Sequence, residues 1–87
     1  MSELKKKFET AAKNAQQLKK RPDDDDMLRL YATYKQATVG DASGERPGAF
    51  DFVARAKYDA WARLRSTDKE KAMKSYIDLV ERLKKLG

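Results

Sequence analysis

Cysteine and histidine are both absent from this sequence of 87 residues. Without cysteine there can be no disulfide framework and no thiolate metal site, so the stability of the fold must come from packing. Without histidine the chain lacks the usual general base, the usual zinc ligand and the usual pH switch. These absences argue against ordinary hydrolase chemistry, and we expect neither catalytic residues nor a metal site.

Long apolar runs are also missing from the sequence. The N-terminal segment passes directly into charged amphipathic sequence, without the apolar core of a signal peptide or the length of a membrane span. A cytoplasmic protein is therefore expected. A chain of this length has room for one domain, so residues 1–87 are predicted to form a single domain.

Basic residues are in excess, with 20 lysines and arginines against 14 aspartates and glutamates and a net charge of +6. Four of the acids are consecutive, at Asp23–Asp26, so the rest of the chain is more basic than the total indicates. The excess favours anionic partners, whether phosphate-bearing ligands, nucleic acid or anionic lipid. The acidic run lacks the ligand spacing and the glycine of an EF-hand loop, and it is typical of a solvated helix start.

Two helices are predicted in the N-terminal half of the chain. Apolar residues recur at intervals of three and four from Leu4 onward, which indicates an amphipathic helix that ends near Lys19. Pro22 disfavours helical geometry at the residue before it. The acidic run suits the positive end of a second helix, which continues to Thr38 and is closed by Gly40.

Residues 40–51 are predicted to form a loop of about a dozen residues between the second and third helices. They hold three of the four glycines and Pro47, and they have no periodic apolar pattern. A short third helix follows, with Asp51 as its N-cap. The last helix begins near a capping box, Thr67–Glu70, and carries a clean apolar stripe. No window requires a strand, so the predicted fold is an all-α four-helix bundle with one long crossover.

The second helix places Tyr31, Tyr34 and Lys35 on neighbouring positions about one turn apart. Two aromatic rings beside an ammonium can stack a purine and contact a phosphate, and stacking contributes about 1–3 kcal/mol per base. The competing interpretation is that both tyrosines pack in the core with their hydroxyls at the rim. On spacing alone, that second interpretation is the commoner one for aromatic residues.

Two further residues are candidates for a binding site. Lys57 can reach across a groove on its flexible stem and act as a point charge on phosphate, or it is an ordinary surface lysine whose stem covers apolar surface. Tyr76 falls in the apolar stripe of the last helix, where core packing is the simplest role. Because a buried hydroxyl needs a partner, the edge of a groove would also suit it.

The longest motif in the chain runs from Tyr31 to Asp41 and is followed by Glu45–Gly48. Shorter motifs are Phe8 with Ala11–Ala12, Pro22, Met27–Leu28, Asp51–Phe52, Lys57, Asp59–Trp61, Ala72–Lys74 and Tyr76–Asp78. In order and spacing these motifs resemble the acyl-CoA-binding protein family, whose members carry long-chain acyl-CoA esters on a small helical domain. The family's fold is a four-helix bundle with a long overhand loop between helices 2 and 3, so the resemblance implies that fold here.

By position, the resemblance implies eight ligand-binding residues: Tyr31, Tyr34, Lys35, Lys57, Tyr76, Ala11, Met27 and Leu28. Tyr31, Lys35 and Lys57 would meet the 3′-phosphate of the coenzyme A ribose. Tyr34 and Tyr76 would line the adenine and pantetheine region. Met27 and Leu28 would shield the acyl chain, and Ala11 would lie close to the ligand. Two positions depart from the family pattern, since Gln16 stands where relatives often have lysine and Tyr58 where tryptophan is common.

The resemblance implies a carrier that binds medium- to long-chain acyl-CoA esters non-covalently, and that buffers and transports them inside the cell. Such a protein would be neither an enzyme nor a holder of cofactors, because acyl-CoA is carried unchanged. We expect a monomer that meets long-chain acyl-CoA and, transiently, membranes or acyl-CoA-using enzymes, and that does not bind nucleic acid.

Two other functions remain to be tested against that expectation. A small basic module for nucleic acid is favoured by the net charge and the tyrosines. An acyl-CoA hydrolase would have to work without histidine, without cysteine and without a serine in a nucleophile elbow.

Overall fold

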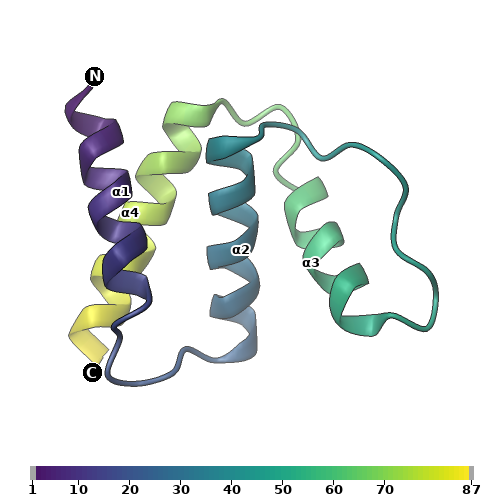
Figure 1. Cartoon of the computed structure of the whole chain (residues 1–87), viewed down its shortest axis with the longest axis horizontal. Helices are drawn as coiled ribbons and strands as arrows, with labels where there is room; N and C mark the ends of the chain where they lie inside the picture. The colour runs from purple at the N-terminus through teal and green to yellow at the C-terminus, as the bar shows by residue number, and fades with distance from the viewer. Residues whose placement is uncertain (1, 87) are drawn as a thin grey trace.

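Residues 2–86 are described by the computed structural model, and they form four helices: α1 (Glu3–Ala15), α2 (Asp24–Thr38), α3 (Phe52–Ala62) and α4 (Lys69–Leu86). No strand occurs among these residues, so the all-α prediction is confirmed. α4 packs against both α1 and α2, and α3 packs against the other side of α2, as Figure 1 shows. The Cα trace is only 15 Å across its shortest dimension. In Figure 1 α1 crosses α4, and α2 and then α3 follow on one side of this pair.

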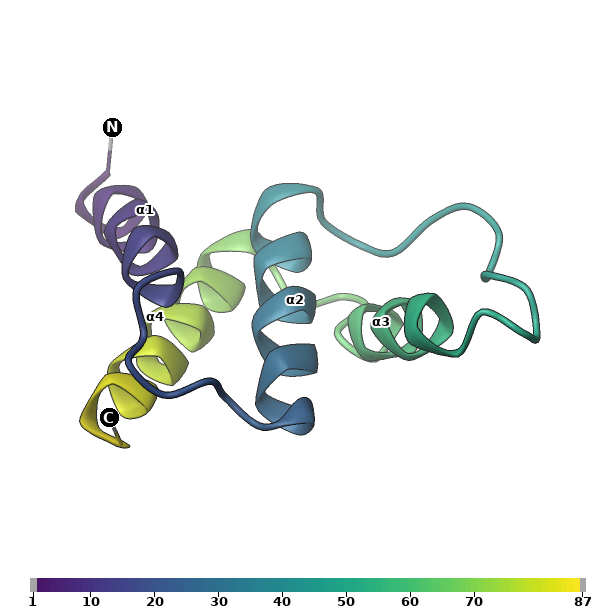
Figure 2. The same cartoon turned by 60° about the horizontal axis from the view of Figure 1, so that its bottom comes forward.

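The long connection between α2 and α3 sets the direction of α3. It leaves the upper end of α2 in Figure 1, passes around the outside of the molecule and enters α3 at the lower end. Figure 2 shows the same connection at the outer edge, beyond α3. As a result α2 and α3 run in the same direction, which a short hairpin loop does not allow. The predicted long crossover is confirmed.

Each helix begins next to a side-chain oxygen that accepts a hydrogen bond from a backbone N–H in the first turn. The four pairs are Ser2 with the N–H of Lys5 (3.1 Å), Asp23 with Asp26 (2.8 Å), Asp51 with Ala54 (3.3 Å) and Asp68 with Lys71 (2.7 Å). The predicted cap at Asp51 and the predicted acidic start of the second helix are confirmed. The predicted capping box at Thr67–Glu70 is wrong. Because α4 starts at Lys69, the capping position falls on Asp68.

The end of α1 is a second correction. The helix ends at Ala15, four residues before the predicted end at Lys19. Its last turn tightens, since the N–H of Gln16 bonds to the carbonyl of Lys13 and the N–H of Gln17 to that of Asn14. Such 3₁₀-type hydrogen bonds, between residues three apart, are common where an α-helix ends. Pro22 restricts the backbone only of the residue before it, so the sequence did not locate the end of α1 more closely.

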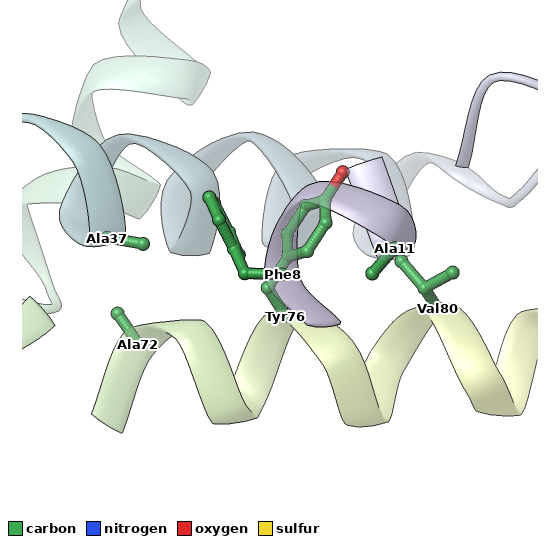
Figure 3. Close-up of a cluster of buried hydrophobic side chains, with 6 residues drawn as sticks. All are labelled: Phe8, Ala11, Ala37, Ala72, Tyr76 and Val80. Carbon is green, nitrogen blue, oxygen red and sulfur yellow. The ribbon is translucent and has the colours of Figure 1, made fainter. Parts of the chain in front are cut away.

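The main core lies where α1, α2 and α4 meet. Its buried members are Phe8, Ala11, Ala37, Ala72, Tyr76 and Val80 (Figure 3). The small alanines of α2 and α4 face each other, while Phe8 and Tyr76 fill the wider space near α1. The predicted apolar stripe of the last helix is confirmed. Tyr76, Val80 and Leu83 are buried, and Met73 and Ile77 pack against this core.

A second, smaller cluster joins α2, α3 and the long connection through Ala32, Ala42 and Trp61. The indole Nε1 of Trp61 donates to the carbonyl of Gly40 at 2.7 Å. Gly40 closes α2 with a φ of 98°, a backbone conformation that favours glycine. The Tyr58 hydroxyl donates to the carbonyl of Gly44 at 3.1 Å. Side chains of α3 thus hold the start of the connection in place.

An ion pair fastens the middle of the connection. The Arg46 guanidinium forms two hydrogen bonds with the Asp59 carboxylate, from Nε to Oδ1 at 2.9 Å and from Nη2 to Oδ2 at 2.7 Å. This two-bond geometry fixes orientation as well as distance. It lowers the pKa of Asp59 below the ordinary value for a carboxyl group, chiefly through the hydrogen bonds from Arg46. The connection is therefore tied to α3 at several points along its length.

Candidate functional site

A groove of about 920 Å³ lies between α2 and α3, with the C-terminal part of α1 and Tyr76 of α4 completing its lining. Because α2 and α3 run in parallel, equivalent turns of the two helices face each other along the groove. The residues of α2 that line it span Asp24 to Tyr34, about 15 Å of helix at 1.5 Å per residue. The groove is therefore long enough for an extended ligand to make different contacts at its two ends.

One end of the groove is mainly apolar. Met27 and Leu28 line it from near the start of α2, and Phe52 and Val53 line it from the first turn of α3. Phe52 is 75% exposed and Val53 is 67% exposed, so this end has apolar side chains that are open to solvent. Arg21 and Asp24 add one charge of each sign.

The other end combines aromatic rings with a cation. Tyr31 and Tyr34 line the groove from α2, about one and two turns beyond Met27, and Lys57 lines it from α3. The Lys57 ammonium lies 5.4 Å from the centre of the Tyr31 ring, so the two side chains meet across the groove. Tyr34 is 41% exposed. This end therefore offers aromatic faces and a positive charge to a ligand that is both aromatic and anionic.

Three aromatic rings support the groove where α1, α2 and α4 meet. The ring centres of Phe8 and Tyr34 are 5.5 Å apart and stacked, and those of Phe8 and Tyr76 are 5.1 Å apart in an edge-to-face arrangement. Tyr76 is buried, and its hydroxyl is directed away from α4 in Figure 3. Burial, followed by the nearby Tyr34, raises the pKa of the Tyr76 hydroxyl above its ordinary value. The hydroxyl is therefore held in its neutral form, able to donate a hydrogen bond.

Six of the eight residues expected to bind a ligand line this groove: Met27, Leu28, Tyr31, Tyr34, Lys57 and Tyr76. The other two do not line it. Ala11 is buried in the main core beside Phe8. The Lys35 ammonium lies 4.9 Å from the centre of a Trp61 ring, where it contacts the second cluster. The ligand contacts of all eight residues stay a prediction.

Sequence reasoning assigned no binding role to Phe52 or Val53, although both line the groove. In the sequence Phe52 was noted only as part of the Asp51–Phe52 motif. The sequence signal was present, since two apolar residues directly follow the Asp51 cap. Assigning them to the site requires the direction of α3, which periodicity does not give. Gln16, the position that departs from the family pattern, also lines the groove.

Within residues 2–86, no group of three or more acidic side chains is arranged to hold a metal ion. The run at Asp23–Asp26 starts α2, and Asp26 forms an ion pair with Arg82 at 2.9 Å. None of the four helices is long and apolar enough to cross a membrane.

The sequence matches a family model described as acyl CoA binding protein over residues 5–80. The chain belongs to the acyl-CoA-binding protein family. It is 47% identical over 81 residues to the acyl-CoA-binding protein homolog of Manduca sexta, which covers 92% of this chain and 90% of that protein. Among solved structures, the acyl-CoA-binding protein 2 of Oryza sativa superposes with a TM-score of 0.90 at 41% identity, covering 95% of this chain and 92% of that one.

One of the relatives is a much longer protein than this chain. This chain is 51% identical over 76 residues to enoyl-CoA delta isomerase 2 of Rattus norvegicus, and the match covers 87% of this chain but only 19% of the isomerase. The agreement with the rice structure confirms the family fold that the sequence motifs implied.

Proposed function

We propose that this protein binds medium- to long-chain fatty acyl-CoA esters non-covalently and buffers and transports them in the cytoplasm. Membership in the acyl-CoA-binding protein family supports binding of this ligand class. In this proposal residues 1–87 act as one acyl-CoA-binding domain and as a monomer. The acyl-CoA is carried unchanged, and the chain catalyses no reaction.

The observation that carries the proposal is the gradient along the groove. Met27, Leu28 and Phe52 make one end apolar, whereas Tyr31, Tyr34 and Lys57 make the other end aromatic and cationic. An acyl-CoA ester has the matching gradient, with an apolar tail joined to a purine nucleotide that carries phosphates. Neither a free fatty acid nor coenzyme A would use both ends.

The roles of individual residues are those that the family resemblance implies, and six of the eight residues line the groove. We assign the 3′-phosphate of the ribose to Tyr31, Lys35 and Lys57, and the adenine and pantetheine region to Tyr34 and Tyr76. Met27 and Leu28 would shield the acyl chain. Ala11, as a small residue in the core beside Phe8, would let the ligand approach α1 closely.

The magnitudes favour the ester over either of its halves. Burial of a methylene contributes about 0.8 kcal/mol, so covering roughly half of the ~14 methylenes of a palmitoyl chain contributes on the order of 6 kcal/mol. One exposed ion pair contributes only about 0.2–1 kcal/mol. The tail therefore provides much of the affinity, and the head group provides the discrimination against free fatty acid.

Isothermal titration calorimetry tests the proposal directly. Palmitoyl-CoA, below its micelle concentration, is compared with coenzyme A and with palmitate in the same buffer. We expect one-to-one binding that is far tighter for the ester than for either half. Equally weak heats for all three ligands would rule the proposal out.

A further inference from the structure

The three most exposed large apolar side chains of residues 2–86 are gathered at the start of α3. Phe50 is 94% exposed, Phe52 is 75% exposed and Val53 is 67% exposed. Phe50 lies in the turn before the helix, and the other two lie in its first turn. We call these three residues the α3 tip. Isolated surface phenylalanines are ordinary, but three such side chains within four residues point to a contact with something apolar.

The α3 tip is continuous with the groove. Phe52 and Val53 belong to both, and they lie at the apolar end together with Met27 and Leu28. Phe50 does not line the groove and is directed to solvent. An apolar ligand that enters or leaves at this end passes beside the tip.

The charges closest to the α3 tip along α3 are basic. Arg55 is three residues after Phe52, and Lys57 is four residues after Val53, so each lies on the next turn beside an exposed apolar side chain. One acid, Asp51, lies between Phe50 and Phe52, where its carboxylate caps the helix.

The remaining acids near the α3 tip have basic counterparts or lie further away. Asp59 is paired with Arg46, and across the groove Arg21 and Asp24 both line the apolar end. Glu45 lies five residues before Phe50 in the connection. The tip is therefore an apolar edge with a cationic border.

We propose that the α3 tip inserts into the surface of a lipid bilayer that contains anionic headgroups. Exposed aromatic and aliphatic side chains enter the boundary between headgroups and acyl chains, and neighbouring lysine and arginine side chains bind anionic lipid. This binding is peripheral, since no helix of residues 2–86 can span the membrane. It turns the apolar end of the groove toward the lipid, so that an acyl chain moves between bilayer and groove with little exposure to water. That last step rests on the proposed function, whereas the docking itself does not.

The test is co-sedimentation with phosphatidylcholine vesicles, prepared with and without phosphatidylserine and free of acyl-CoA. We expect the wild-type chain to partition onto the vesicles that contain phosphatidylserine. Phe50→Ser should weaken this partitioning by about fivefold or more, because an interfacial phenylalanine side chain is lost. The matched control is Leu86→Ser, which removes another exposed apolar side chain at the end of α4 and should leave partitioning unchanged.

The charged border has its own pair of variants. Arg55→Gln should weaken partitioning onto the vesicles, and Arg63→Gln should not. The two variants are matched, because the charges of both arginines lower the pKa of Asp59. Because Phe50 does not line the groove, Phe50→Ser should bind palmitoyl-CoA in solution with wild-type affinity.

Two outcomes would overturn the docking proposal. One is that the wild-type chain fails to sediment with phosphatidylserine vesicles, in which case a protein partner becomes the better occupant of the tip. The other is that Phe50→Ser and Leu86→Ser sediment equally. Neither result depends on acyl-CoA, so failure of the docking proposal and failure of the carrier proposal are distinguishable.

Discussion

Lys57→Met is the sharpest test of the groove, because it removes the ammonium and keeps an unbranched apolar side chain. Lys57 lines the groove opposite Tyr31, and its Nζ is 5.4 Å from the centre of that ring. An ammonium about 4 Å from a phosphate interacts by roughly 4 kcal/mol at an effective dielectric constant of about 20.

The net loss of affinity is smaller than this Coulomb energy. Lys57 is exposed, so water screens its charge and binding must order its flexible stem. We therefore expect Lys57→Met to weaken palmitoyl-CoA binding by about 10- to 30-fold, which corresponds to about 1.4–2 kcal/mol. The loss should shrink as salt concentration rises, because exposed charges are screened.

The matched control is Lys74→Met, which removes the same charge from an exposed position of α4 that does not line the groove. Both variants are titrated with palmitoyl-CoA by calorimetry at low and high salt. Equal affinities for Lys57→Met and Lys74→Met would refute the assignment of Lys57 to the phosphate. Far-UV circular dichroism establishes that both variants are folded.

Three further predictions concern stability. Trp61→Phe should lower the free energy of unfolding by about 1–3 kcal/mol in urea titrations, because it removes the hydrogen bond to Gly40 and part of a buried ring. Tyr76→Phe should flatten the loss of stability above about pH 10. The raised pKa of the Tyr76 hydroxyl means that the unfolded chain loses this proton first, so stability falls as pH rises toward the folded-state pKa. Asp41→Asn should flatten the loss of stability below about pH 4. Hydrogen bonds from Gln36 and from the Ser66 N–H lower the pKa of Asp41 below 3.8, so this stability is present above 3.8 and is lost as pH falls through the folded-state pKa.

Each of these predictions has a clear contrary result. Wild-type stability in Trp61→Phe would mean that the indole bond does not hold the connection. Parallel pH profiles of stability for wild type and Tyr76→Phe above pH 10 would mean that the Tyr76 hydroxyl titrates alike in the folded and unfolded chains. Parallel profiles for wild type and Asp41→Asn below pH 4 would mean the same for the Asp41 carboxyl group.

Local sequence signals predicted the helices well because helix formation depends on neighbours a few residues apart. The apolar period, the Asp51 cap and Gly40 are all local, and they located three of the four helices closely. The predictions that failed were finer ones. The end of the first helix was set by a tightened last turn, and the N-cap of the last helix fell on Asp68.

The chemistry of the site was only partly visible in the sequence. Tyr31, Tyr34 and Lys57 were picked out from residue type and from the family motifs, and the groove brings these three residues together. Lys35 was expected beside them, but its ammonium lies over Trp61 in this structure. The position of a residue in a helix determines the face of the helix from which its side chain extends. The direction of a long flexible side chain such as lysine also depends on its neighbours in space.

The sequence by itself determined four amphipathic helices, a long connection and membership in a family with a recognisable set of motifs. Only the tertiary structure decided that α2 and α3 run in parallel, which places apolar side chains at one end of the groove and the tyrosines and Lys57 at the other. It also decided that Phe50, Phe52 and Val53 form an exposed edge. The physical reason is that helix periodicity acts over three to four residues, whereas the bond between Trp61 and Gly40, which helps to hold the connection, joins residues 21 apart.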